Sequence, residues 1–137
     1  MPGKMEASNQ MKWAAILSFL LVSMATSSVL ACDVRESYIA RLGAADHFNS
    51  SGVRLRSAAA IIRQDRANFH QFGKRDPEDD DDRFFASTEN RALLERMLAT
   101  GDSSPSVLAD IINGTPLILV RVCRSARGDY VIVSVAR

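Results

Sequence analysis

The residues best suited to chemistry lie between positions 64 and 70, in the sequence QDRANFH. In a helix, this spacing groups side chains that lie about one turn apart. Asp65, Asn68 and His70 could therefore orient a water molecule or a metal ion, and His47 could approach them from a separate segment. One hypothesis is thus a cation-dependent or hydrolytic enzyme that uses these four side chains.

The alternative interpretation of this polar cluster is a structural network, which the sequence favours. A zinc site needs three or four ligands, and two His without an HExxH, CxxC or HxH spacing give weak support for one. Asp and Asn side chains bond readily to neighbouring backbone or to arginines. The chain also lacks the GxSxG, GxGxxG and P-loop motifs. No catalytic or cofactor-binding residue is therefore assigned.

An acidic segment is the second place that could bind a ligand. Six of the seven residues from 76 to 82 are acidic, and they follow two basic residues. Carboxylates suit calcium, the one cofactor that the sequence suggests. Its candidate ligands are Asp79, Asp80, Asp81 and Asp82, although they lack the Gly and the distal Glu of an EF-hand loop. The competing prediction is an exposed, solvated loop.

The two cysteines have incompatible predicted fates. The residues Val29-Leu30-Ala31-Cys32 resemble the lipobox of bacterial lipoproteins, although Leu30 is larger than the residue usual at that position. The resemblance implies a lipidated Cys32 and a protein at the membrane surface. The favoured alternative is a Cys32 to Cys123 disulfide, since an exported protein would otherwise keep one unpaired thiol. It requires either a first strand that runs antiparallel to the strand that ends at Cys123, or an N-terminus loose enough to fold back.

The N-terminal region is typical of a secretory signal peptide. Lys4 and Lys12 precede an apolar core at residues 14–25, and small residues end at Ala31. The prediction is a signal peptide over residues 1–31 and a single exported domain over 32–137. This predicts the periplasm or the extracellular space, an unknown envelope or extracellular partner, and no transmembrane span after processing. A formal net charge of +1 argues against nucleic acid as the partner.

Hydrophobic periodicity predicts an α+β domain in the order strand-helix-helix-strand-strand-strand. Two helices should pack on one face of a sheet that ends in an antiparallel meander. The expected elements are a strand over 34–42, helices over 57–71 and 87–99, and strands over 107–112, 115–123 and 130–136, with an Asn113-Gly114 hairpin turn. The strand over 115–123 should be central, because both of its faces are apolar. The predicted core contains Ile62, Leu94, Leu98, Leu119, Val120 and Ile132.

Together these patterns predict a small exported, non-enzymatic binding or interaction module that acts through its exposed polar helix or loop. The enzyme built on Asp65, Asn68, His70 and His47 is the alternative. The positions of these side chains distinguish the two hypotheses, because an enzyme requires them to line one concave site.

Overall fold

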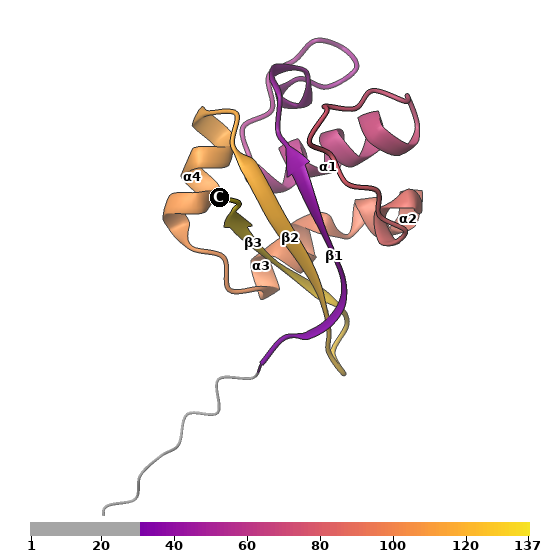
Figure 1. Cartoon of the computed structure of the whole chain (residues 1–137), viewed down its shortest axis with the longest axis vertical. Coiled ribbons are helices and arrows are strands. Elements are labelled where there is room, and N and C mark those ends of the chain that lie inside the picture. The colour runs from indigo at the N-terminus through magenta and orange to yellow at the C-terminus, as the bar shows by residue number, and fades with distance from the viewer. Residues whose placement is uncertain (1–30) are drawn as a thin grey trace, which may run out of the picture. The chain divides into compact units, whose positions relative to one another are not determined.

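A three-stranded antiparallel sheet forms the centre of the protein (Figure 1). The computed structural model describes residues 31–137, so residues 1–30 of the predicted signal peptide lie outside the described residues. The strands are β1 (Asp33–Arg41), β2 (Leu117–Arg124) and β3 (Tyr130–Val135), in the spatial order β1-β2-β3. As the apolar pattern predicted, β2 is the central strand.

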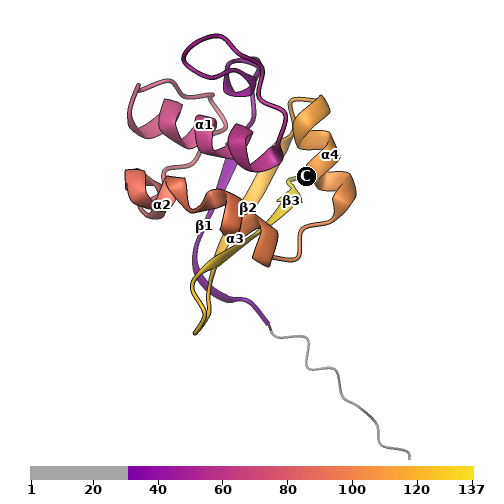
Figure 2. The same ribbon diagram turned by 180° about the vertical axis from the view of Figure 1, so that it is seen from behind.

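Four α-helices lie between β1 and β2 along the chain. They are α1 (Ala58–His70), α2 (Thr88–Ala92), α3 (Leu94–Thr100) and α4 (Pro105–Asn113). Serine side chains cap the first residues of three of them, since Ser57, Ser87 and Ser104 each accept a bond from a backbone N–H three residues later. Figure 2 shows α1, α2 and α3 in front of the strands, on one face of the sheet. None of the helices in residues 31–137 is long and apolar enough to cross a bilayer.

The predicted α+β class and antiparallel sheet are confirmed, but two local predictions are wrong. Residues 107–112 belong to helix α4, and β1 takes the place that this segment was expected to fill beside β2. Ser104 caps α4 and Pro105 opens it, both of which favour a helix start. Gly114 ends the helix in an extended conformation, so no hairpin turn forms there. The predicted second helix is divided into α2 and α3 at Leu93.

The hydrophobic core lies between the helices and the inner face of the sheet. Four predicted core residues are buried there, namely Ile62, Leu94, Leu98 and Val120. The prediction is wrong for Leu119 and Ile132, which are only half-buried. Side chains alternate between the two faces of a strand, and the neighbours of Leu119 occupy the inner face. Leu119 therefore points away from the helices.

Candidate functional site

The guanidinium of Arg66 is the centre of the buried polar network that includes the predicted cluster. The Arg66 Nε donates to Asp65 Oδ2 at 2.8 Å, and its Nη1 donates to Asp82 Oδ1 at 2.8 Å. The guanidinium carbon lies 4.4 Å from the centroid of the Tyr38 ring and 4.5 Å from that of Phe69. Arg66 is completely buried, and its guanidinium contacts two carboxyl groups and two aromatic faces.

Asp82 connects this network to His70 and to the start of the next turn. Its Oδ1 lies 2.7 Å from His70 Nε2, and its Oδ2 accepts the backbone N–H of Phe85 at 2.7 Å. The Asp82 side chain is fully buried. The sequence placed Asp82 in an exposed acidic loop, and that placement is wrong for this residue. A carboxylate with three internal donors is part of the folded framework.

Two carboxylates share one guanidinium in this network, and burial raises the pKa of Asp65 to about 8. The Arg66 charge opposes that rise without cancelling it. Burial also raises the pKa of the Tyr38 hydroxyl well above its usual value. A neutral Asp65 leaves Arg66 paired with the single negative charge of Asp82. The group suggested as a catalytic acid or metal ligand is thus a buried side chain that keeps its proton near neutral pH.

The protonated state of Asp65 leads to a pH-dependent prediction. Its pKa in the folded chain lies above the value of about 3.9 in an unfolded chain, so folding favours the bound proton. This contribution to stability is complete below pH 4 and is lost as the pH rises through 8. We compare the free energy of unfolding of Asp65→Asn with that of the parent. We expect this difference to shift in favour of Asp65→Asn by at least about 1 kcal/mol as the pH rises from 5 to 8. Urea unfolding at several pH values measures this difference.

The matched control for this experiment is Asp81→Asn, which changes an exposed acid in the same region. Its unfolding free energy should follow that of the parent protein at every pH. If the free energies of unfolding of the parent and of Asp65→Asn changed with pH in parallel, Asp65 would instead be charged in the folded protein.

The other two candidate residues, Asn68 and His47, belong to a second network beside the 3-10 turn that follows β1. Asn68 Nδ2 donates to Asp46 Oδ1 at 2.8 Å, and Gln64 Nε2 donates to Asn68 Oδ1 at 3.0 Å. His47 is buried, and its two ring nitrogens each lie 2.8 Å from a backbone carbonyl oxygen, those of Gly43 and Ile111. These bonds tie the 3-10 turn Ala44–His47 to α1 and α4.

The four candidate catalytic residues do not line one concave site. Asp65 and His70 lie around Arg66, whereas Asn68 and His47 belong to the network of Asp46. None of the five main cavities in residues 31–137 is lined by both histidines. The arrangement supports the structural network, because each of the four side chains bonds to an internal partner. Within residues 31–137, the Tyr38 hydroxyl and Arg66 Nη2 are buried without a hydrogen-bond partner.

The acidic segment covers the outer edge of strand β1. The backbone N–H of Asp80 donates to Ile39 O at 2.8 Å, and Asp80 Oδ2 accepts the N–H of Ile39 at 2.9 Å. Asp79 Oδ1 accepts the N–H of Arg41 at 2.8 Å. Within residues 31–137, no three His, Cys, Asp or Glu side chains are arranged to hold a metal ion. Calcium binding by Asp79, Asp80, Asp81 and Asp82 thus stays an untested hypothesis without geometric support.

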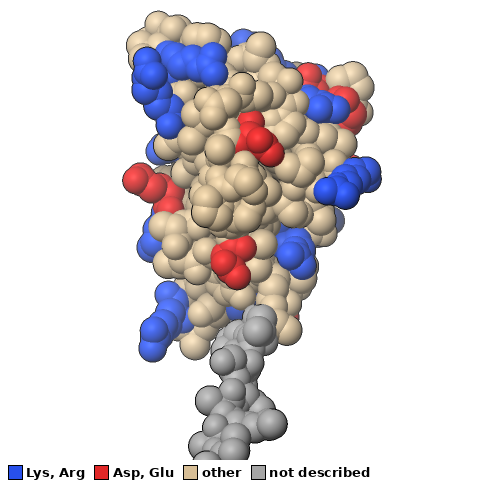
Figure 3. Space-filling model, turned by 90° about the vertical axis from the view of Figure 1, so that its left-hand side faces the viewer, with Lys and Arg blue, Asp and Glu red and all other residues tan. Residues whose placement is uncertain are grey.

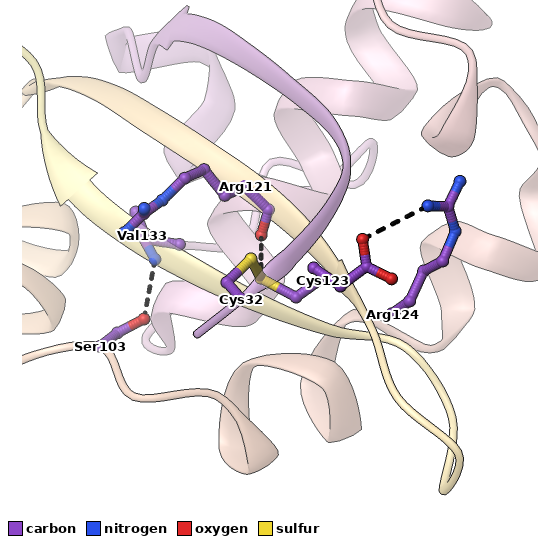
Figure 4. Close-up of a disulfide and its surroundings, with 7 residues drawn as sticks. Cys32, Ser103, Arg121, Cys123, Arg124 and Val133 are labelled. Carbon is purple, nitrogen blue, oxygen red and sulfur yellow. Dashed lines mark hydrogen bonds and ion pairs between the residues drawn. A yellow bond between two sulfur atoms is a disulfide. The ribbon is translucent and has the colours of Figure 1, made fainter. Parts of the chain in front are cut away.

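Figure 4 shows the disulfide between Cys32 and Cys123, which confirms the predicted pairing. The two Cα atoms lie 5.3 Å apart, and the bond joins residues 91 positions apart in the sequence. Antiparallel pairing of β1 with β2 makes this possible, since Val34 is the register partner of Cys123. A bonded Cys32 sulfur has no free thiol for a lipid.

An open groove along the outer side of α1 was not predicted from the sequence. Its volume is about 460 Å³. Small side chains form part of its surface, and Phe72, which follows the end of α1 in the sequence, is half exposed. Its principal lining residues are Leu55, Ala60, Arg63, Gln64, Ala67, Gln71, Phe72 and Glu95. The sequence signal that could have indicated this groove was the presence of two small residues, Ala60 and Ala67, on the polar side of the predicted helix.

Comparison with protein families, with characterised proteins and with solved structures finds no match to this chain, so its geometry alone carries the functional argument.

Proposed function

We propose that this chain is a small exported protein, of the periplasm or the extracellular space, that acts by binding a polypeptide segment in the groove along α1. The Cys32 to Cys123 disulfide is compatible with an oxidising compartment. Charges of both signs are interspersed on the face that contains α4, and no continuous basic surface forms there (Figure 3). That distribution gives no support to nucleic acid as the ligand.

The observation that carries this proposal is the chemistry of the groove. Gln64 and Gln71 offer amide donors and acceptors that suit a peptide backbone, and Arg63 adds a cation. Ala60 and Ala67 leave room for a backbone to approach, and the exposed Phe72 ring offers apolar contact. The candidate catalytic groups are held in buried networks instead. A binding module accounts for both features.

The test fills the groove without disturbing the core. Ala67→Trp places a large ring in the groove, and Ala126→Trp is the matched control in the exposed turn between β2 and β3. We expect the purified parent protein and Ala126→Trp to retain the same polypeptide from envelope and culture fractions of the host. Ala67→Trp should lose it at an unchanged unfolding midpoint. Retention by all three proteins would exclude the groove as the binding site.

A further inference from the structure

The sheet face opposite α1, α2 and α3 carries several large apolar side chains among its polar ones, whereas a solvent-facing sheet is normally polar. Leu117 and Leu119 of β2 lie on it, and Ile39 of β1 is the register partner of Leu119. These side chains are only half-buried. Figures 1 and 2 together show α1, α2 and α3 on the other side of the strands. We call this surface the open sheet face. Its large side chains are Ile39, Leu117, Leu119, Arg121, Tyr130 and Ile132, and the register places Ser37, Arg41 and Ser134 among them.

Arg121 gives the open sheet face a positive charge without a counterion in the described part of the chain. Three arginines at its margins have acidic partners, since Arg35, Arg41 and Arg124 pair with Asp129, Glu78 and Asp33. Arg121 forms no ion pair within residues 31–137, and its Nε is buried without a hydrogen-bond partner there. Figure 4 shows its side chain extending from β2 toward β3. A carboxylate of a partner would supply the missing counterion of the guanidinium.

The form of this surface limits what can bind to it. None of the five main cavities in residues 31–137 is lined by Leu119 or Arg121. Small molecules favour concave sites, so a broad surface without a cavity suits a protein. Arg and Tyr are also the residue types enriched in protein interfaces, and Arg121 and Tyr130 both lie on this face.

Both edges of the sheet are occupied, which disfavours addition of a partner strand. The segment containing Asp80 bonds to the outer edge of β1. On the outer edge of β3, Ser103 Oγ accepts the N–H of Val133 at 2.9 Å, and Gly101 packs so closely on the Val131 carbonyl that a Cβ would collide with it. The face of the sheet is therefore the available surface.

A second copy of the chain fits this face poorly. A symmetric dimer needs a patch that complements itself. The three acids that pair with Arg35, Arg41 and Arg124 at the margin of the open sheet face are not free to pair with Arg121 of another copy. Charge complementarity points to a different protein.

We propose that the open sheet face docks a protein partner through an apolar segment carrying an Asp or Glu side chain, which pairs with Arg121. This surface is distinct from the groove along α1, because α1 lies on the opposite side of the sheet. The apolar contacts supply buried area, and the ion pair selects an acidic partner over a basic one.

The experiment first locates the partner and then tests the ion pair. The full chain is expressed in its host with a photo-crosslinking amino acid at Leu119, or at the exposed Ala99 of α3 as the control. The crosslinked segment is identified by mass spectrometry and made as a synthetic peptide. Its affinity is measured for the parent protein, for Arg121→Gln and for Arg63→Gln, after equal urea midpoints confirm that all three are folded.

We expect crosslinking from position 119 but not from position 99, to an apolar segment that contains an acid. Its affinity should fall at least about tenfold in Arg121→Gln and stay unchanged in Arg63→Gln. The proposal is overturned by the absence of a crosslink at position 119 or by a crosslink to a second copy. It is also overturned if the peptide binds Arg121→Gln as tightly as it binds the parent protein. Weakening by Arg63→Gln alone would instead place the peptide in the α1 groove.

Discussion

Removing the disulfide with Cys32→Ser and Cys123→Ala is expected to lower the free energy of unfolding by about 4 kcal/mol on the chain-entropy model. The bond closes a long loop, because its ends are 91 positions apart in the sequence. Opening that loop gives the unfolded chain more conformations, whereas β1 and β2 keep their register in the folded chain. Alanine suits position 123 because Cys123 is completely buried. Urea unfolding measures the loss.

Reduction provides the matched control for the disulfide variant. Dithiothreitol should destabilise the parent protein by a similar amount and leave the variant unchanged. Intact mass should show that the native parent lacks two hydrogens, which return on reduction. A diacylglyceryl adduct at the N-terminus would contradict the pairing and would support the lipobox resemblance.

Arg66→Leu is expected to destabilise the protein by about 3 to 5 kcal/mol, because it leaves buried acid without its cation. The Asp82 carboxyl would lose its cation in a fully buried position, and the guanidinium that lies between the Tyr38 and Phe69 rings would be absent. Leucine is shorter and uncharged, so it cannot replace the ion pair with Asp82 or the contacts with the two rings. Urea unfolding at pH 7 measures this loss.

The same substitution three residues earlier on α1 is the control. Arg63 is exposed, so Arg63→Leu should change the free energy of unfolding by less than about 0.5 kcal/mol. Similar losses of unfolding free energy in the two variants would mean that the loss comes from helix propensity or from the removal of any positive charge on α1. In that case the Arg66 network would not be a major source of stability.

Local sequence signals were sufficient for the elements whose periodicity is long or whose ends are capped. The pattern from Leu55 to Phe69 and the Ser57 cap located α1 because a helical repeat over several turns has no strand equivalent. The apolar β2 was recognised as central from the lack of a polar face. These features depend on neighbours along the chain, which the sequence displays directly.

Only the tertiary structure decided the identity of α4 and the state of the polar cluster. A short apolar run such as residues 107–112 fits a helix or a strand equally well, and packing against the core selected the helix. Likewise, an acidic run looks solvated in sequence, yet Asp82 is buried because Arg66 lies opposite it in the fold. The sequence separation of 16 residues conceals that pair.

The sequence by itself determined the fold class and the main helix, and it limited Cys32 to two fates without deciding between them. The tertiary structure selected the disulfide, because antiparallel pairing places β2 beside the start of β1. It also decided which apolar face of β2 is covered, since helices are available for one side only. Periodicity records how a segment alternates along the chain, whereas burial depends on which distant segments pack against it.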